Sequence, residues 1–243
     1  MANIFEQYGI KEVADVTIYK FDDDGNPVPF LFLDTLKVST IEQTAEQSDA
    51  RGGKGNSKLI TWDYGKEINV TLEDALYSPA SMALMWSGKV DKLSTATATI
   101  EKLIRYTPTG NTIGSTIKDG DGKTWNVAGY VAENGKFFDT LPTTVTAGQS
   151  YTLKVTTAAT DAKSIVIEAD DFPGTYKIVG DTYARNRDTG IDEYFQFIIH
   201  RAKMSAEQTL TLEAEGDPST FNLNLTVLRP TDGKMMELIQ YTL

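Results

Sequence analysis

The feature that most constrains the fold of this chain is a repeated alternation of apolar and polar residues with a period of two. Successive side chains of a β-strand point to opposite faces, so this period is typical of strands with one buried face. The alternating segments are rich in β-branched and aromatic residues, which favour strands. We therefore predict an all-β fold. The segments are 13–21, 58–63, 68–74, 95–106, 151–157, 164–169, 194–200, 209–215, 221–229 and 235–241.

Short glycine-containing sequences separate several of these segments. The sequences 22-DDDGN-26, 119-DGDG-122 and 134-NG-135 each predict a tight turn between extended runs. The last two alternating segments flank 230-PTDG-233, where proline and glycine occupy positions that suit a turn. We therefore predict that 221–229 and 235–241 form a terminal β-hairpin.

One segment, 78-SPASMALMWSG-88, predicts a short helix instead of a strand. Ser78 is a good N-cap, and Pro79 fits the first helical turn, where its missing N–H costs nothing. Gly88 stands where a left-handed C-terminal residue is favoured. The helix would cover one end of the β core with an apolar face made of Met82, Met85 and Trp86.

The length of 243 residues suits one large β domain or a core domain with an insertion. Residues 108–172 are richer in Gly, Thr, Asp and Lys than the rest, and 141-LPTTVTAGQS-150 is typical of a connector. We predict a core made of 1–107 and 173–243. Residues 108–172 would form a hairpin-rich elaboration or a small inserted β-domain.

Charge and composition exclude several classes of function. The net charge is −11, from 34 acidic and 23 basic residues, and such a surface disfavours tight binding to DNA or RNA. The absence of cysteine excludes disulfide and thiolate sites. The first residues do not resemble a signal peptide, and no apolar run approaches the roughly 18 residues of a membrane helix. We expect no membrane association.

No constellation of residues predicts catalysis, a metal site or a cofactor site. The sequence around Gly53 and Lys54 lacks the spacing and the following helix of a phosphate-binding loop. His200 is the only histidine, which is too few for a zinc site in a chain without cysteine. Glu73 and Asp74 are neighbours on a predicted strand, so they point to opposite faces and cannot act on one bond. We predict that the chain is not an enzyme and needs no cofactor.

The glycine-rich stretch 49-DARGGKGNSK-58 carries three cations within an acidic chain. A plain hairpin needs only a two-residue connection, and ordering a longer loop costs about 1–2 kcal/mol per residue. Either this is a tolerated surface loop, or it becomes ordered against an acidic partner, such as another copy of the chain. The candidate assembly loop comprises Asp49, Arg51, Gly52, Gly53, Lys54, Gly55, Asn56 and Lys58.

Three stretches, 58–85, 178–204 and 210–229, resemble the major tail tube proteins of tailed bacteriophages, which are virion structural proteins. The resemblance implies a β-sandwich or partly open barrel flanked by a short helix. It also implies rings, typically hexameric, that stack into a hollow tube with an acidic lumen, through which DNA passes without specific binding. By position, 45–58 would be the arm that reaches the neighbouring ring, and 82–86 would lie in the flanking helix.

The same resemblance implies partners and a location. The partners would be other copies of the chain, together with sheath, tape measure and baseplate proteins. The location would be the phage tail, after synthesis in the cytoplasm of the bacterial host. Another virion role remains open at this point: a head decoration protein, a tail terminator or a baseplate component. A more distant alternative is a carbohydrate-binding β-sandwich that uses exposed aromatic residues such as Trp62, Trp86 and Trp125.

Overall fold

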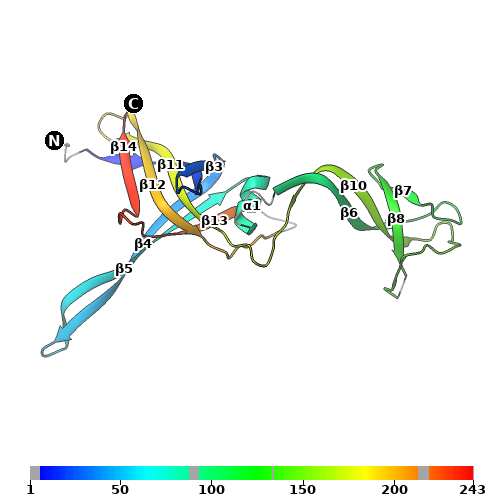
Figure 1. The fold of residues 1–243 in the computed structure, drawn as a ribbon, viewed down its shortest axis with the longest axis horizontal. Coiled ribbons are helices and arrows are strands. Elements are labelled where there is room, and N and C mark those ends of the chain that lie inside the picture. The colour runs from blue at the N-terminus through cyan, green and yellow to red at the C-terminus, as the bar shows by residue number, and fades with distance from the viewer. Residues whose placement is uncertain (1–5, 88–92, 133, 213–218, 243) are drawn as a thin grey trace. The chain divides into compact units, whose positions relative to one another are not determined.

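The computed structural model describes residues 6–87, 93–132, 134–212 and 219–242. The chain forms two compact units (Figure 1). The first, here the core unit, consists of Met1–Leu93 and Ile165–Leu243, and the second, here the inserted unit, is Ser94–Ser164. The sequence suggested an insertion at 108–172. The inserted unit starts earlier, because the strand Leu93–Tyr106 belongs to it, and it ends earlier, where the strand Tyr151–Ile165 ends.

The core unit is built on one antiparallel sheet of nine strands. Seven of them follow the order β3-β2-β11-β12-β13-β5-β4, while β1 pairs with β11 and β14 pairs with β12. These pairings are antiparallel throughout. The strands are β1 (Tyr8–Ile10), β2 (Asp15–Phe21), β3 (Pro27–Leu33), β4 (Leu36–Gly52), β5 (Ser57–Asp74), β11 (Thr175–Asn186), β12 (Asp192–Met204), β13 (Phe221–Val227) and β14 (Met236–Tyr241).

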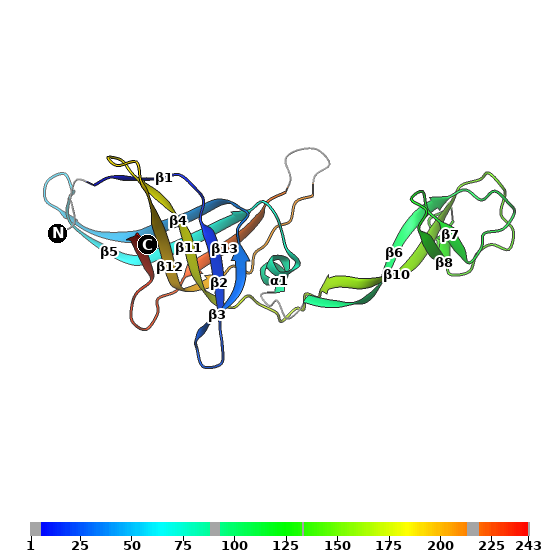
Figure 2. The same ribbon diagram turned by 90° about the horizontal axis from the view of Figure 1, so that it is seen from above.

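The two ends of this path, β3 and β4, are consecutive in the chain and are separated only by Asp34 and Thr35. An extended chain advances at most about 3.6 Å per residue, so this connection brings the two edges of the sheet close together. The sheet therefore curls, as Figure 2 shows. No pairing between β3 and β4 is present among the described residues, so the barrel stays open. The predicted mainly β class with a partly open barrel is confirmed.

The curled sheet encloses the core of this unit. Alternate residues of its strands point inward, as the period of two predicted, and one cluster joins residues from both halves of the sheet. Gly180 on β11 lies opposite Phe197 on β12. A Cβ atom at position 180 would come within 2.2 Å of the Phe197 ring, so glycine is what lets this ring lie across the strand. The fully buried side chains include Val16, Ile18, Leu72, Ile178, Ile199 and Leu223.

The predicted helix is present as α1 (Pro79–Ser87). Ser78 caps it, because its Oγ accepts a hydrogen bond from the Ser81 amide at 3.0 Å, and the Ser81 Oγ accepts one from the Ser78 amide at 2.8 Å. Leu84 and Met85 are buried in the core cluster, and Trp86 packs against it. Met82, on the other hand, is half-buried. Gly88 lies outside the described residues.

The prediction of a terminal hairpin is wrong. β13 and β14 do not pair with each other; both pair with β12. β12 has 13 residues, so one edge of it accommodates β14 along Tyr194–Ile199 and β13 along Ala202–Met204. The turn at Pro230 does form, since the Gly233 amide donates to the Pro230 carbonyl at 3.0 Å. This turn lies within the longer connection from β13 to β14, and β14 then pairs with β12 and not with β13.

Two other predictions, the strands at 164–169 and 209–215, are wrong over most of the residues that the structure describes. Beyond Ile165, the segment 166–169 forms no strand, and neither does 209–212; residues 213–215 lie outside the described residues. Val166, Ile167 and Leu212 are exposed. Alternation produces a strand only where a neighbouring strand supplies hydrogen bonds and a core covers the apolar face, and neither is available here.

The inserted unit contains a five-stranded antiparallel sheet in the order β6-β10-β8-β7, with β9 paired to β8. Its small core contains Ile117, Trp125, Leu153 and Val155. Asp119 holds the predicted turn 119–122, since it accepts hydrogen bonds from the amides of Asp121 and Lys123 and from the Trp125 indole. The strands are β6 (Leu93–Tyr106), β7 (Thr116–Lys118), β8 (Thr124–Val131), β9 (Phe137–Phe138) and β10 (Tyr151–Ile165).

Candidate functional site

The candidate assembly loop lies at the end of a long β-hairpin formed by β4 and β5 (Figure 1). β13 pairs with β5 only along Asn69–Asp74, where alternate residues of β5 are buried. Residues 57–67 of β5 are exposed. From Glu46 to Tyr64 the two strands therefore pair only with each other, and we call this part, residues 46–64, the hairpin arm.

The glycines of the candidate loop form the turn of the hairpin arm. The turn spans residues 53–56, and the Asn56 amide donates to the Gly53 carbonyl at 3.2 Å. Gly53 and Gly55 have positive φ angles of 79° and 89°, which a residue with a Cβ rarely adopts. The sequence suggested a loop longer than a hairpin requires. The structure instead gives the glycines a local geometric role in a four-residue turn.

Asp49 organises the polar face of the hairpin arm. Its carboxylate binds Lys58 at 2.9 Å and Arg51 at 3.1 Å, and it accepts a hydrogen bond from the Thr61 hydroxyl at 2.9 Å. These contacts, with the hydrogen bond from Lys58 the largest, hold the pKa of Asp49 below its usual value. Among the described residues, Lys54 is the one cation of the candidate loop without an ion pair. The positive charge available to a partner is therefore smaller than the sequence implied.

The opposite face of the hairpin arm is apolar and uncovered. Ile60, Trp62 and Tyr64 are alternate residues of β5, so they share one face, and each side chain is a little more than half exposed, at 53%, 54% and 53%. Their partners on β4 are the small or polar residues Ala50, Ser48 and Glu46, which do not cover them. Sequence reasoning missed this apolar face. The alternation in 58–63 predicts a strand with one buried face, and the same pattern fits a strand whose apolar face lies beyond the core.

The three tryptophans lie in three different surroundings. Trp62 is exposed on the hairpin arm, and Trp86 packs against the core. Trp125 is buried in the inserted unit, where its indole N–H donates to Asp119 at 2.8 Å. They do not line one surface, so the interpretation of the chain as a carbohydrate-binding module built on these tryptophans is wrong.

The described residues offer no evident centre for catalysis or metal binding. In this part of the chain, no group of three or more histidine, cysteine, aspartate or glutamate side chains could hold a metal ion. His200 contacts the Glu237 carboxylate at 3.2 Å, and Glu237 also pairs with Lys234. Glu237 thus joins a hydrogen-bonding contact with His200 and an ion pair with Lys234. None of the helices in the described ranges has the length and apolar character needed to cross a bilayer.

Comparison with known proteins identifies the family of this chain. The sequence matches the YomU/Tube protein family over residues 8–240. The chain belongs to this family. The match extends through residues 94–164, so the inserted unit lies within the region that the family shares. The resemblance to phage tail tube proteins, which rested on 58–85, 178–204 and 210–229, is confirmed.

One curated relative supports the same assignment. The chain is 26% identical over 242 residues to a protein named "Tail tube protein" from Bacillus phage SPR. The alignment covers 95% of this chain and 87% of the relative, so the likeness is not restricted to the core unit. Both comparisons thus point to a structural protein of the phage tail tube.

Proposed function

We propose that this YomU/Tube family member is the repeating subunit of a phage tail tube, and that its copies self-assemble into stacked rings around a channel for DNA. The observation that carries the proposal is the uncovered apolar face of the hairpin arm. Family membership and the tail tube relative support the role of the subunit. The resemblance of the sequence to tail tube proteins supports rings of six subunits as part of this proposal.

The hairpin arm has a physical reason to seek a partner. An isolated two-stranded ribbon is at best marginally stable in water. Ile60, Trp62 and Tyr64 leave about half of their surface in water. Covering the exposed halves of three such side chains contributes on the order of 2–5 kcal/mol per arm. A partner that covers this face therefore stabilises both the contact and the arm.

A second copy of the chain is the partner that fits best. Every copy carries the same arm, and an arm that binds a different surface on the next copy forms a heterologous contact, which extends into rings or filaments. The free edges of β3 and β4 offer a second contact within a ring, because an unpaired strand edge can continue the sheet of a neighbour. The net charge of −11 suits a channel that DNA passes without binding.

The structure favours an apolar contact for the arm over the electrostatic contact that the sequence suggested. Asp49 neutralises much of the charge of Arg51 and Lys58 within the same hairpin. Exposed ion pairs contribute little to binding and are screened by salt. Stacking that depends on Ile60, Trp62 and Tyr64 would instead persist at high salt, because the hydrophobic effect is not screened.

Two triple variants of the same hairpin test the proposal. The first replaces Ile60, Trp62 and Tyr64 by serine, and the second replaces Arg51, Lys54 and Lys58 by serine. We expect negative-stain electron microscopy of the wild type and of the cationic variant to show rings and tubes. The apolar variant should show single subunits or unstacked rings while keeping the far-ultraviolet circular dichroism of the wild type. Tubes of normal length from the apolar variant would contradict the proposed role of the arm.

A further inference from the structure

The inserted unit differs from the core unit in charge. Residues 94–164 contain seven basic and six acidic residues, which gives a net charge of +1. The whole chain has 23 basic and 34 acidic residues, so the remainder has 16 and 28, or −12. The inserted unit is thus the part of the chain that an anionic ligand can approach with the least repulsion.

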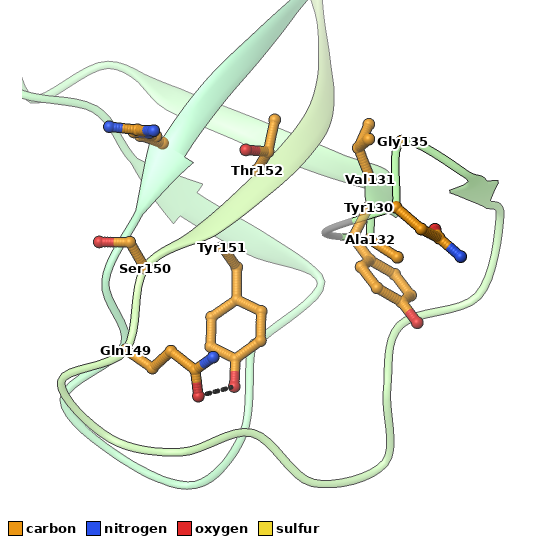
Figure 3. Close-up of a pocket in the computed structure, with 10 residues that line it drawn as sticks. Tyr130, Val131, Ala132, Gly135, Gln149, Ser150, Tyr151 and Thr152 are labelled. Carbon is orange, nitrogen blue, oxygen red and sulfur yellow. Dashed lines mark hydrogen bonds between the residues drawn. The ribbon is translucent and has the colours of Figure 1, made fainter.

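This unit also carries an open surface hollow of about 970 Å³, here the tyrosine hollow. That volume lies near the upper end of the range for small-molecule sites. Two tyrosine side chains line it, Tyr130 from β8 and Tyr151 from the start of β10 (Figure 3). The polar residues of the lining that bear on its chemistry are Arg105, Asn134, Gln149 and Ser150.

Packing holds both tyrosine rings in place without a ligand. Tyr130 stacks on Phe138 with ring centroids 5.2 Å apart and planes inclined by 14°. The Tyr151 hydroxyl accepts a hydrogen bond from the Thr146 amide at 2.9 Å and donates one to Gln149 at 3.4 Å, the second of which is drawn in Figure 3. Both rings also pack against the small core of the unit. A ligand would meet preorganised surfaces and lose little free energy in ordering them.

Among the described residues that line the tyrosine hollow, several side-chain hydrogen-bond donors are unused. Within the described residues, the Arg105 guanidinium and the Tyr130 hydroxyl form no hydrogen bond or ion pair. The Asn134 side chain uses only its oxygen, which accepts from the Lys136 amide, so its NH₂ group is free. Gln149 likewise uses only its oxygen. A guanidinium and two amide groups match a ligand rich in acceptor oxygens, including a carboxylate or phosphate.

We propose that the tyrosine hollow binds a saccharide that bears a carboxylate or phosphate group. The sugar rings would lie against Tyr130 and Tyr151, whose faces are rigid and apolar and whose hydroxyls are polar. The ring hydroxyls would meet Asn134 and Gln149, and the anionic group would bind Arg105. A nucleic acid fits less well, because Arg105 is the single cation among the described residues of the lining and binding to a phosphate backbone requires several.

A printed glycan array with neutral, uronic-acid and phosphorylated sugars tests this proposal on the full chain. We expect binding to be confined to the charged sugars, and the array separates the carboxylate source from the phosphate source. Arg105→Gln should raise the dissociation constant of the best ligand at least tenfold. Asn134→Ala should raise it severalfold and lower the melting temperature only slightly, since Asn134 is exposed and its one printed hydrogen bond, to the Lys136 amide, lies within an exposed turn.

Lys118→Gln supplies the matched control. It removes the same charge from an exposed position of the same unit, outside the lining of the hollow, and should leave the dissociation constant unchanged. No bound sugar on the array would overturn the proposal. So would equal losses from Lys118→Gln and Arg105→Gln, or tighter binding to polyacrylate or to an oligonucleotide than to the sugar. Each of these results is separable from tube assembly, which electron microscopy of the same variants reports independently.

Discussion

The core unit and the inserted unit are both antiparallel β structures, yet they differ in core size and in charge. The core unit encloses a large apolar cluster within a curled nine-stranded sheet, while the inserted unit holds a small cluster around Trp125. The first carries a net charge of −12 and the second +1. The contrast shows that the two units of one chain carry surfaces of different charge and polarity. An acidic body that projects an apolar arm is joined to a nearly neutral unit with a donor-rich hollow.

The largest expected loss of stability comes from making a cavity in the core of either unit. Leu72→Ala in the core unit and Leu153→Ala in the inserted unit each remove a fully buried leucine side chain. Each should lower the free energy of unfolding of its own unit by about 2–5 kcal/mol. Amide hydrogen exchange should place the loss of protection within 94–164 for Leu153→Ala and outside it for Leu72→Ala. Equal loss in both units from either variant would show that they unfold as one cooperative structure.

A smaller loss of stability is expected at a glycine that another side chain contacts closely, and almost none at a glycine with no close neighbour. Gly180→Ala would bring a Cβ atom against the Phe197 ring, so the ring must move, and we expect a loss of about 1–3 kcal/mol. Gly120→Ala, in the turn of the inserted unit, meets no atom within 4 Å and should change the unfolding free energy by less than about 0.5 kcal/mol. Chemical denaturation of both variants measures this. Equal midpoints would contradict the close approach at Gly180.

The smallest effect concerns pH and the hairpin arm. Since folding lowers the pKa of Asp49, its ion pairs stabilise the arm above the unfolded value near 3.8 and lose that contribution as pH falls through the lower folded value. We expect the protection of the amides around residues 53–56 to fall below pH 3.8. Asp49→Asn should show weak protection at every pH and no such transition. A transition that persists in Asp49→Asn would assign it to another carboxylate.

Much of the fold follows from local patterns. Alternation predicts most strands, and the cap at Ser78 with Pro79 predicts α1, because these signals act through contacts within a few residues. The terminal hairpin and the strands expected at 166–169 and 209–212 are the failures. In each of them the local pattern is satisfactory, but the pairing depends on which distant strand has a free edge. β12 supplied that edge to both β13 and β14.

The candidate site shows the same limit. The sequence predicted an assembly loop at 49–58, and the resemblance to tail tube proteins implied an arm at 45–58, with the charges of Arg51, Lys54 and Lys58 as the expected contact. Two facts that only strand pairing reveals are the basis for proposing an apolar contact instead. Asp49 lies close enough to bind two of the cations, and Ile60, Trp62 and Tyr64 extend beyond the last strand that could cover them.

The sequence by itself determined the mainly β class, the short helix, the acidic character and the resemblance to tail tube proteins. These properties depend on composition and on side chains a few positions apart. The tertiary structure decided the register of β12 with its two partners, the exposure of the apolar face of the arm and the assembly of the tyrosine hollow from β6, β8 and β10. Such features depend on contacts between residues that are far apart in the chain. Only the folded structure determines which of those residues come into contact.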